Sequence, residues 1–323
     1  MSEQIRAFWL AEPGRGEIRT EELPARQTGD VFVRTLHTGV SRGTETLVFN
    51  GRVPVAQHQL MRAPFQDGDF PAPVKYGYLN VGLVEAGPAE LIGRTVFSLV
   101  PHQSAYVVPA AAVTVVPAGV PAHRAVLAGT VETAVNAVWD AIPAVGDRIT
   151  VIGAGMVGCA VAGVLAGLPA ARVQLVDVNP DRARTAAALG VEFALPDQAD
   201  SDRDVVVHAS ATSSGLTRAL ELAGNEATIV ELSWYGDRRV EVPLGEFFHS
   251  RRLRIQGSQV GQVAPARRPR RSYGDRMRIA FELLKSDRFE ALITGHSAFE
   301  ELPDVLSRLA GQESKTICNV IDY

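Results

Sequence analysis

The fold of this chain is decided by the stretch Val151-Ile152-Gly153-Ala154-Gly155-Met156-Val157-Gly158. Its three glycines follow the G-x-G-x-x-G pattern, after an apolar run that predicts a strand over residues 148–153 and before a small-residue run that predicts a helix. In such a unit the glycines permit a tight turn, let the backbone approach a pyrophosphate and let helix and strand pack closely. The start of the helix also offers free N–H groups to phosphates. We therefore predict a dinucleotide-binding loop made of Gly153, Gly155, Met156, Val157 and Gly158.

A carboxylate and an arginine follow this loop at the place where a dinucleotide would put its adenosine. Asp177 lies at the end of the next predicted strand, about 20 residues after the glycines, where an acid accepts hydrogen bonds from ribose hydroxyls. Since a carboxylate repels a 2′-phosphate, Asp177 predicts NAD(H) rather than NADP(H) as the cofactor. Arg182 leaves the other choice open, because an arginine nearby can receive that phosphate.

The pattern of the chain changes at about residue 140. Before it, short β-branched runs bounded by Gly, Pro or Asp predict a mainly β region. After it, strands alternate with helices, which predicts an α/β fold with a parallel doubly wound sheet. Ser210 stands at the carboxyl end of the strand predicted over residues 204–209, so we expect it to face the nicotinamide pocket. His208 on the same strand is expected to be a packed side chain.

Composition limits the remaining possibilities. A length of 323 residues suits two domains better than one, and a net charge of −4 argues against nucleic acid as a partner. Two cysteines exclude a disulfide framework and a multi-cysteine metal site. The N-terminus lacks the regions of a signal peptide, and no apolar run reaches the ~18 residues of a membrane span, so we expect a cytoplasmic protein with no membrane partner. Residues 267–271 are rich in arginine and predict an exposed loop; the alternative is that they bind an anionic substrate or a phosphate.

The strand-rich front, the central dinucleotide-binding unit and the returning tail together resemble the medium-chain dehydrogenase/reductase superfamily, over nearly the whole chain. Residues 38–45, Thr-Gly-Val-Ser-Arg-Gly-Thr-Glu, are similar to the segment with the first catalytic zinc ligand, and Ser41 stands in place of the cysteine. Residues 73–82 are similar to the Gly-His-Glu segment, with Tyr78 and Leu79 in place of the zinc-binding histidine and the glutamate. The two segments look closest to the branch that contains bacteriochlorophyllide dehydrogenases.

This resemblance implies a domain organisation and several site residues. It implies a GroES-like catalytic domain over residues 1–133, a Rossmann NAD-binding domain over residues 134–257, and a C-terminal return over residues 258–323 that completes the catalytic domain. It also implies a homodimer. By analogy it places Arg42 at the cofactor pyrophosphate, Arg182 at the adenosine end and Glu132 where polyol dehydrogenases keep a metal-associated glutamate.

The departures from the superfamily pattern predict a protein without zinc. Serine, tyrosine and leucine do not supply the thiolate, imidazole or carboxylate that zinc prefers, and the stretch after Phe97 lacks the cysteines of a structural zinc lobe. Hydrogen bonds and a proton relay must then polarise the substrate oxygen. Each candidate for this role has a structural alternative: Ser41 as a turn residue, Tyr78 as a pocket wall, His102 as a surface loop residue and Glu132 as a helix cap.

The sequence thus predicts a zinc-independent, NAD(H)-dependent oxidoreductase that interconverts a secondary alcohol and a ketone on a small organic or biosynthetic substrate. Two other functions remain open. One is a quinone or enone reductase of the same superfamily, which usually prefers NADPH, so that Asp177 weighs against it. The other is a dinucleotide-binding sensor without turnover, which the loss of the metal ligands makes conceivable.

Overall fold

The computed structural model describes residues 4–311 and 315–323 and divides the chain into two compact units. Unit 1 consists of Met1–Gly129 and Ile293–Tyr323, and unit 2 is Thr130–Leu292. The sequence led us to place the start of the C-terminal return at residue 258, whereas residues 258–292 stay with unit 2. Buried polar bonds within unit 2 explain the difference: Arg276 forms an ion pair with Glu132, and Ser258 donates a hydrogen bond to Asp140.

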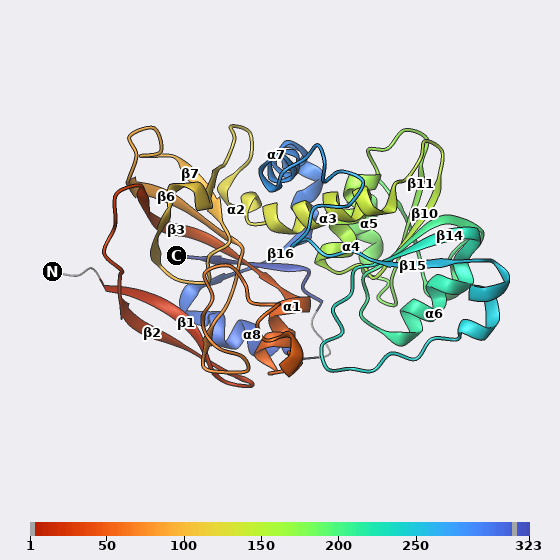
Figure 1. Cartoon of the computed structure of the whole chain (residues 1–323), viewed down its shortest axis with the longest axis horizontal. Helices are drawn as coiled ribbons and strands as arrows, with labels where there is room; N and C mark the ends of the chain where they lie inside the picture. Colours follow the sequence, from red (N-terminus) through yellow and green to blue (C-terminus); the bar gives the residue numbers. More distant parts are fainter. Residues whose placement is uncertain (1–3, 312–314) are drawn as a thin grey trace. The chain divides into compact units, whose positions relative to one another are not determined.

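Unit 2 is built on a six-stranded parallel sheet in the order β12-β11-β10-β13-β14-β15. This is the 3-2-1-4-5-6 order of a Rossmann fold, which confirms the predicted α/β class. Figure 1 shows β10, β11, β14 and β15 side by side in green to cyan. The strands are β10 (Arg148–Ile152), β11 (Arg172–Val176), β12 (Glu192–Ala194), β13 (Arg203–His208), β14 (Ala223–Glu231) and β15 (Arg254–Gly257).

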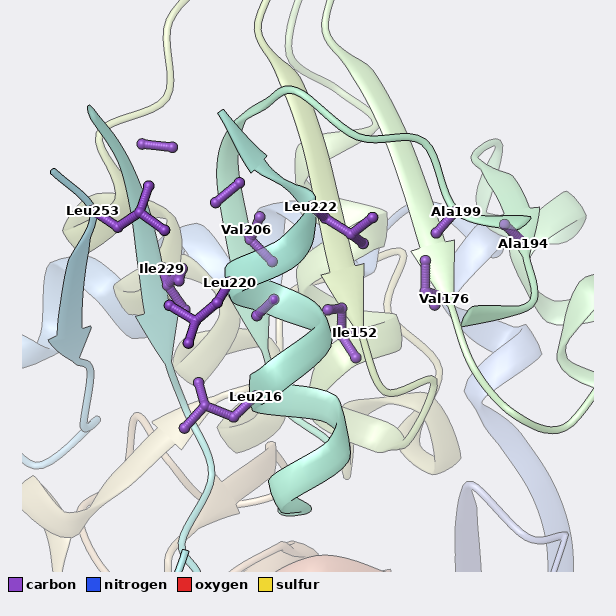
Figure 2. Close-up of a cluster of buried hydrophobic side chains, with 13 residues drawn as sticks. Ile152, Val176, Ala194, Ala199, Val206, Leu216, Leu220, Leu222, Ile229 and Leu253 are labelled. Carbon is purple, nitrogen blue, oxygen red and sulfur yellow. The ribbon is translucent and has the colours of Figure 1, made fainter. Parts of the chain in front are cut away.

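Helices cover this sheet because its strands are apolar on both faces, as parallel strands are. In Figure 2 the side chain of Leu220 on α6 lies beside Ile229 on the sheet, and Leu216 and Val206 belong to the same buried cluster. Thr212 caps the start of α6 by accepting a hydrogen bond from the backbone of Gly215. The helices of unit 2 are α3 (Ala128–Ala141, which begins two residues before the division), α4 (Met156–Leu165), α5 (Arg182–Leu189), α6 (Ser213–Leu222) and α7 (Tyr273–Leu284), with short turns η3 (Pro196–Gln198), η4 (Leu244–Phe248) and η5 (Asp287–Leu292).

Unit 1 is mainly β, as predicted. A larger sheet has the order β16-β17-β3-β6-β7-β9, with β8 paired to β3, and a smaller one has the order β2-β1-β5-β4. Valines from these strands pack around Tyr106 to form a core. The strands are β1 (Gln4–Glu12), β2 (Arg15–Glu22), β3 (Asp30–Ser41), β4 (Asp67–Gly68), β5 (Val74–Lys75), β6 (Asn80–Ala86), β7 (Thr95–Ser98), β8 (Ala105–Pro109), β9 (Val113–Val115), β16 (Ile293–Ala298) and β17 (Cys318–Asp322).

Short helices complete unit 1. They are α1 (Arg42–Phe49), α2 (Ala122–Ala125) and α8 (Leu302–Ala310), with turns η1 (Val55–Gln57), η2 (Ala110–Ala112) and η6 (Phe299–Glu301). The long strand β3 leads directly into α1, so that Ser41 ends the strand and stands at the start of the helix. Throughout residues 4–311 and 315–323, every helix is too short or too polar to cross a membrane.

Candidate functional site

The glycine loop between β10 and α4 has the geometry that dinucleotide binding requires. Gly153 has a φ of 102°, and a Cβ atom placed on it would come within 2.8 Å of the Ser210 backbone. A Cβ on Gly158 would lie 1.9 Å from the Gly153 carbonyl oxygen, so only glycine lets the helix approach the strand there. Around Gly155, in contrast, a Cβ would meet no atom within 4 Å. The open side of the loop is therefore at its middle glycine.

The start of α4 can receive an anion at this open side. Gly155 is exposed and is the N-cap residue of α4, and no side chain makes a capping hydrogen bond at this end of the helix. Met156 is buried and Val157 half-buried, so their side chains hold the helix while the N–H groups of the first turn have no partner within the helix. These N–H groups and the helix dipole favour a phosphate. The residues present thus fit a pyrophosphate.

Asp177 is connected directly to the glycine loop. Its Oδ2 accepts a hydrogen bond from the Ala154 N–H at 2.7 Å, and its Oδ1 accepts one from the Asn179 N–H at 2.8 Å. Each carboxylate oxygen can accept more than one hydrogen bond, which leaves capacity for a ribose hydroxyl. Arg182, the first residue of α5, is only 8% exposed.

At the carboxyl ends of β13 and β14, His208 bridges two polar side chains. It is fully buried, with its Nδ1 2.7 Å from Glu231 Oε2 and its Nε2 2.7 Å from Ser210 Oγ. His208 is buried, as expected for a packed side chain. Its two polar contacts were not expected from the sequence.

Unit 1 contains a second buried histidine, His102, which the sequence analysis named as a catalytic candidate. His102 Nε2 lies 2.8 Å from Glu45 Oε2, and its Nδ1 lies 2.7 Å from Thr38 Oγ1. The second carboxylate oxygen of Glu45 accepts the backbone N–H of Ser41 at 2.8 Å. His102 is 1% exposed, so the alternative that it is a surface loop residue is wrong. A Cβ on Gly77 would lie 2.7 Å from the imidazole Cδ2, so that glycine lets His102 sit here.

Tyr78 joins this cluster because its hydroxyl lies near the side chains of Ser41 and Thr44, which act on its pKa. Burial, together with the negative charge of Glu45, raises the pKa of Tyr78 to about 12, although those two side chains work against the rise. The phenol therefore stays protonated at neutral pH. We call Ser41, Glu45, Tyr78 and His102 the His102 cluster.

The structure thus brings together three of the four predicted catalytic residues, Ser41, Tyr78 and His102. They lie around Glu45, which the sequence analysis did not predict. The sequence held one signal for Glu45. It stands four residues after Ser41 at the start of a helix, where a carboxylate can reach back to the backbone N–H of the residue that begins the turn.

The fourth predicted residue, Glu132, lies in unit 2 and has another partner. Its carboxylate accepts a hydrogen bond from Arg276 Nε at 3.0 Å, and both side chains are nearly fully buried. Burial raises the pKa of Glu132, while Arg276 opposes the rise. Glu132 lies within α3 and four residues after its first, so its alternative role as a helix cap is wrong.

Arg42, expected near a pyrophosphate, donates in this structure to two carbonyl oxygens at the end of α8. Its Nε and Nη2 lie 3.3 Å from the oxygens of Leu309 and Gly311, respectively. A guanidinium is favoured at the carboxyl end of a helix, where carbonyl groups lack partners within the helix.

The donor set at the His102 cluster does not fit a zinc site. Zinc needs at least three protein ligands of thiolate, imidazole or carboxylate type, and here His102 and Glu45 are hydrogen-bonded to each other. Leu79 is fully buried and packs beside Gly39 and Gly129. Among residues 4–311 and 315–323, no group of three or more His, Cys, Asp or Glu side chains is arranged to hold a metal ion.

Comparisons with known proteins agree with the fold. No family model matches the chain. An uncharacterized zinc-type alcohol dehydrogenase-like protein from Haemophilus influenzae is 25% identical, with 96% of each chain covered. The crystal structure of L-idonate 5-dehydrogenase from Escherichia coli has a TM-score of 0.81 at 16% identity, covering 100% of this chain and 99% of the other.

Two further similar structures contain a cofactor. A short chain alcohol dehydrogenase from Escherichia coli complexed with NADH has a TM-score of 0.78 at 18% identity, with 99% of each chain covered. A putative zinc-binding dehydrogenase from Sinorhizobium meliloti bound to NADP has a TM-score of 0.79 at 16% identity, covering 99% of this chain and 100% of the other. These comparisons show that the chain is similar to a zinc-type alcohol dehydrogenase-like protein over nearly its whole length and that it shares the fold of several dehydrogenases.

Proposed function

We propose that this chain is a zinc-independent, NAD(H)-dependent oxidoreductase that interconverts a secondary alcohol and a ketone on a small organic substrate. The observation that carries the proposal is the buried pair of Glu45 and His102, beside Ser41 and Tyr78, in a chain that also has a dinucleotide loop. The dehydrogenase names of the relative and of the similar structures support the same reaction class. The resemblance to the bacteriochlorophyllide dehydrogenase branch and the homodimer stay predictions.

The cofactor is bound by unit 2. When bound, a nicotinamide ring supplies the hydride acceptor or donor for the reaction. The N–H groups at the start of α4 bind the pyrophosphate beside the open face of Gly155, and the Asp177 carboxylate accepts a ribose hydroxyl. We prefer NAD(H) because a 2′-phosphate would bring negative charge next to Asp177.

The proton is handled by the His102 cluster. Tyr78, with a pKa of about 12, is a hydrogen-bond donor to the substrate oxygen rather than a group that gives up its proton near neutral pH. Imidazole is the side chain most often used in general acid–base catalysis, so we assign the proton to His102 and its hydrogen-bonded partner Glu45. Ser41 lies between the two parts, since its side chain is near the Tyr78 hydroxyl and its backbone N–H donates to Glu45.

A zinc dehydrogenase would instead polarise the oxygen by Lewis acidity. The sequence relative is called zinc-type, but in this chain Ser41, Tyr78 and Leu79 stand where the family resemblance puts the metal ligands. We therefore propose that hydrogen bonds replace the metal.

The test is a spectroscopic assay of the purified protein with NADH and a panel of ketones, and with NAD⁺ and the matching secondary alcohols. We expect stoichiometric consumption of NADH with at least one ketone and its reversal with the alcohol. Consumption with enones or quinones alone would replace the proposal with a double-bond or quinone reductase. Tight NADH binding without consumption across the whole panel would replace it with a sensor.

A further inference from the structure

The second buried histidine, His208, lies where a Rossmann unit binds its ligand. Its strand, β13, is parallel to β14, and His208 is in register with Glu231 at the carboxyl end of both strands. Ligands of doubly wound sheets bind outside these strand ends. Ser210 is two residues farther along and lies against the dinucleotide loop, since a Cβ on Gly153 would come 2.8 Å from its Cα atom.

The carboxylate of Glu231 is held by several hydrogen-bond donors. The Ser233 N–H donates to Oε1 at 2.7 Å, and the Tyr235 hydroxyl donates to Oε2 at 3.0 Å. The imidazole Nδ1 of His208 lies 2.7 Å from the same Oε2, with the Tyr235 ring stacked on the imidazole. Burial acts to raise the pKa of Glu231, but the bonds from His208 and Ser233 outweigh it and hold that pKa below its usual value. Glu231 is therefore an ionised carboxylate that can only accept.

Because the Glu231 carboxylate accepts the hydrogen bond from Nδ1 of His208, the direction of the remaining hydrogen bonds is fixed. Because Glu231 only accepts, the Nδ1 of His208 carries a hydrogen, and a ring with its single hydrogen there accepts the hydroxyl hydrogen of Ser210 at Nε2. Thr212 Oγ1, 2.9 Å from Ser210 Oγ, must then donate to it, which suits Thr212 because it also accepts the Gly215 N–H. Ser210 Oγ is left with an unused lone pair and no hydrogen to offer outward.

From this chain of bonds we propose that His208 and Glu231 are positioning residues that fix Ser210 Oγ as a hydrogen-bond acceptor for the bound dinucleotide. The inference rests on the dinucleotide binding in the proposed function. A donor hydrogen on that ligand comes either from a ribose hydroxyl or from the nicotinamide carboxamide. A phosphate oxygen, which only accepts, gains a hydrogen bond from a serine only when the hydroxyl points outward, and here it does not.

The order serine, histidine and carboxylate is also that of a hydrolase triad. A hydrolase needs backbone N–H groups free to bind an oxyanion near the serine. The N–H of Ala211, the residue next to Ser210, instead donates to Ser233 Oγ at 3.1 Å. We therefore assign Ser210 to ligand recognition.

The sharpest test is Glu231→Gln, because it reverses the chain of bonds with almost no change in shape. The single oxygen of the glutamine must face the Ser233 N–H, which cannot turn round, so its NH₂ group faces His208 Nδ1. The imidazole then has to accept at Nδ1 and carry its hydrogen on Nε2. Ser210 accepts from that hydrogen, and its own hydrogen is released toward a ligand that also donates.

The first measurement is the ¹⁵N chemical shift of the histidine ring at neutral pH, with His208→Gln used to assign the signal. We expect a neutral ring with its hydrogen on Nδ1 in the wild-type protein and on Nε2 in Glu231→Gln. A merely structural role for Glu231 would not move this signature. A charged ring, or a hydrogen on Nε2 in the wild type, would overturn the inference.

The second measurement is calorimetric binding of NADH and of ADP-ribose, which keeps the ribose hydroxyls and lacks the carboxamide. We expect Ser210→Ala to weaken the binding of NADH by about 2- to 10-fold, which is the value of one hydrogen bond. Glu231→Gln should weaken NADH binding at least as much. Ser210→Thr, which keeps the hydroxyl, should restore it. The exposed Ser250→Ala serves as the control. Equal weakening of ADP-ribose assigns the donor to a ribose hydroxyl, and weakening of NADH alone assigns it to the carboxamide. Wild-type affinity of Ser210→Ala for both ligands would overturn the role of Ser210, whereas a wild-type protein that binds neither would overturn the proposed function itself.

Discussion

The Oε2 of Glu45 lies 2.8 Å from the Nε2 of His102, and the two side chains are only 3% and 1% exposed. Removing an imidazole and a carboxylate from water is costly, and an apolar pair of the same volume often stabilises a protein as well or better. The pair lies beside Ser41 and Tyr78, which stand in the two segments whose resemblance to metal-ligand segments was noted from the sequence, and this position is the reason for the catalytic role that we propose.

Substitution of His102 or Glu45, the pair to which we assign the proton, should lower turnover without weakening the binding of the cofactor. We expect His102→Gln and Glu45→Gln to reduce kcat by about 10²–10⁴-fold, the usual value of general acid–base catalysis, while the Kd of NADH stays unchanged. His249→Gln, at an exposed position, is the matched control. A loss of NADH affinity that accounts for the whole effect would argue against this role.

Zinc should not be needed. We expect the purified protein to contain far less than one zinc per chain, and chelators to leave its activity and its thermal midpoint unchanged. The reason is that, among residues 4–311 and 315–323, no three side chains of the type that zinc prefers are arranged around a common point. One full equivalent of zinc, whose removal abolishes activity, would contradict the prediction.

The pKa of Tyr78 predicts a change of stability at alkaline pH. A tyrosine ionises near pH 10 in the unfolded chain and at about 12 here, so its contribution to the free energy of unfolding is complete below pH 10 and is lost as the pH rises toward 12. The wild-type protein should therefore lose stability relative to Tyr78→Phe over that range. Denaturant unfolding of both proteins from pH 8 to 12 measures the difference, and the comparison cancels the effects of the other tyrosines. Parallel curves for the two proteins would show that Tyr78 is not desolvated.

Local patterns in the sequence were enough to predict the glycine loop, the position of Asp177 and the parallel sheet. The glycines at 153, 155 and 158 and the acid at 177 follow from the requirements of one strand–turn–helix unit, and the order of apolar strands and helices gave the parallel sheet. Of these two expectations the parallel sheet is confirmed, and it does not depend on long-range pairing of side chains. The roles of the glycines and of Asp177 in cofactor binding stay predictions.

The buried polar pairs could not be predicted in this way. His102 and Glu45 are 57 residues apart in the chain, and Arg276 and Glu132 are 144 apart, so only the tertiary fold brings each pair together. The residue types were visible in the sequence, but an isolated histidine or glutamate is compatible with a surface position. For the same reason Glu132 could not be separated from the residues around His102.

The preference for NAD(H) can be tested at Asp177. We expect Asp177→Ala to weaken NADH binding and to reduce the discrimination against NADPH, because it removes both the acceptor for the ribose hydroxyls and the charge that repels a 2′-phosphate. The variant also loses the bond to the Ala154 N–H, so the exposed Asp197→Ala is the control for charge alone. The measurement is the ratio of the Kd values for the two cofactors. An unchanged ratio would remove Asp177 from the proposal.

The ion pair of Glu132 and Arg276 should matter for stability. Arg276 also donates to Asn136 Oδ1 and to the Val260 carbonyl, so it fastens α7 and the preceding loop to α3. Arg276→Met would leave a buried carboxylate without its partner, which costs about 3–5 kcal/mol of unfolding free energy, whereas the exposed Arg278→Met on the same helix should stay within about 0.5 kcal/mol of the wild type.

The pH dependence of Arg276→Met and a double variant separate charge from packing. Burial already raises the pKa of Glu132, and without the opposing guanidinium that pKa rises further, so the destabilisation should be larger at pH 8 than at pH 5, where the carboxyl binds a proton at less cost. The double variant Glu132→Leu/Arg276→Met removes both charges and should recover part of the loss, although the bonds to Asn136 and Val260 remain broken. A double variant no more stable than Arg276→Met, with a loss that does not vary with pH, would show that α7 is held by packing and by those other bonds rather than by the ion pair.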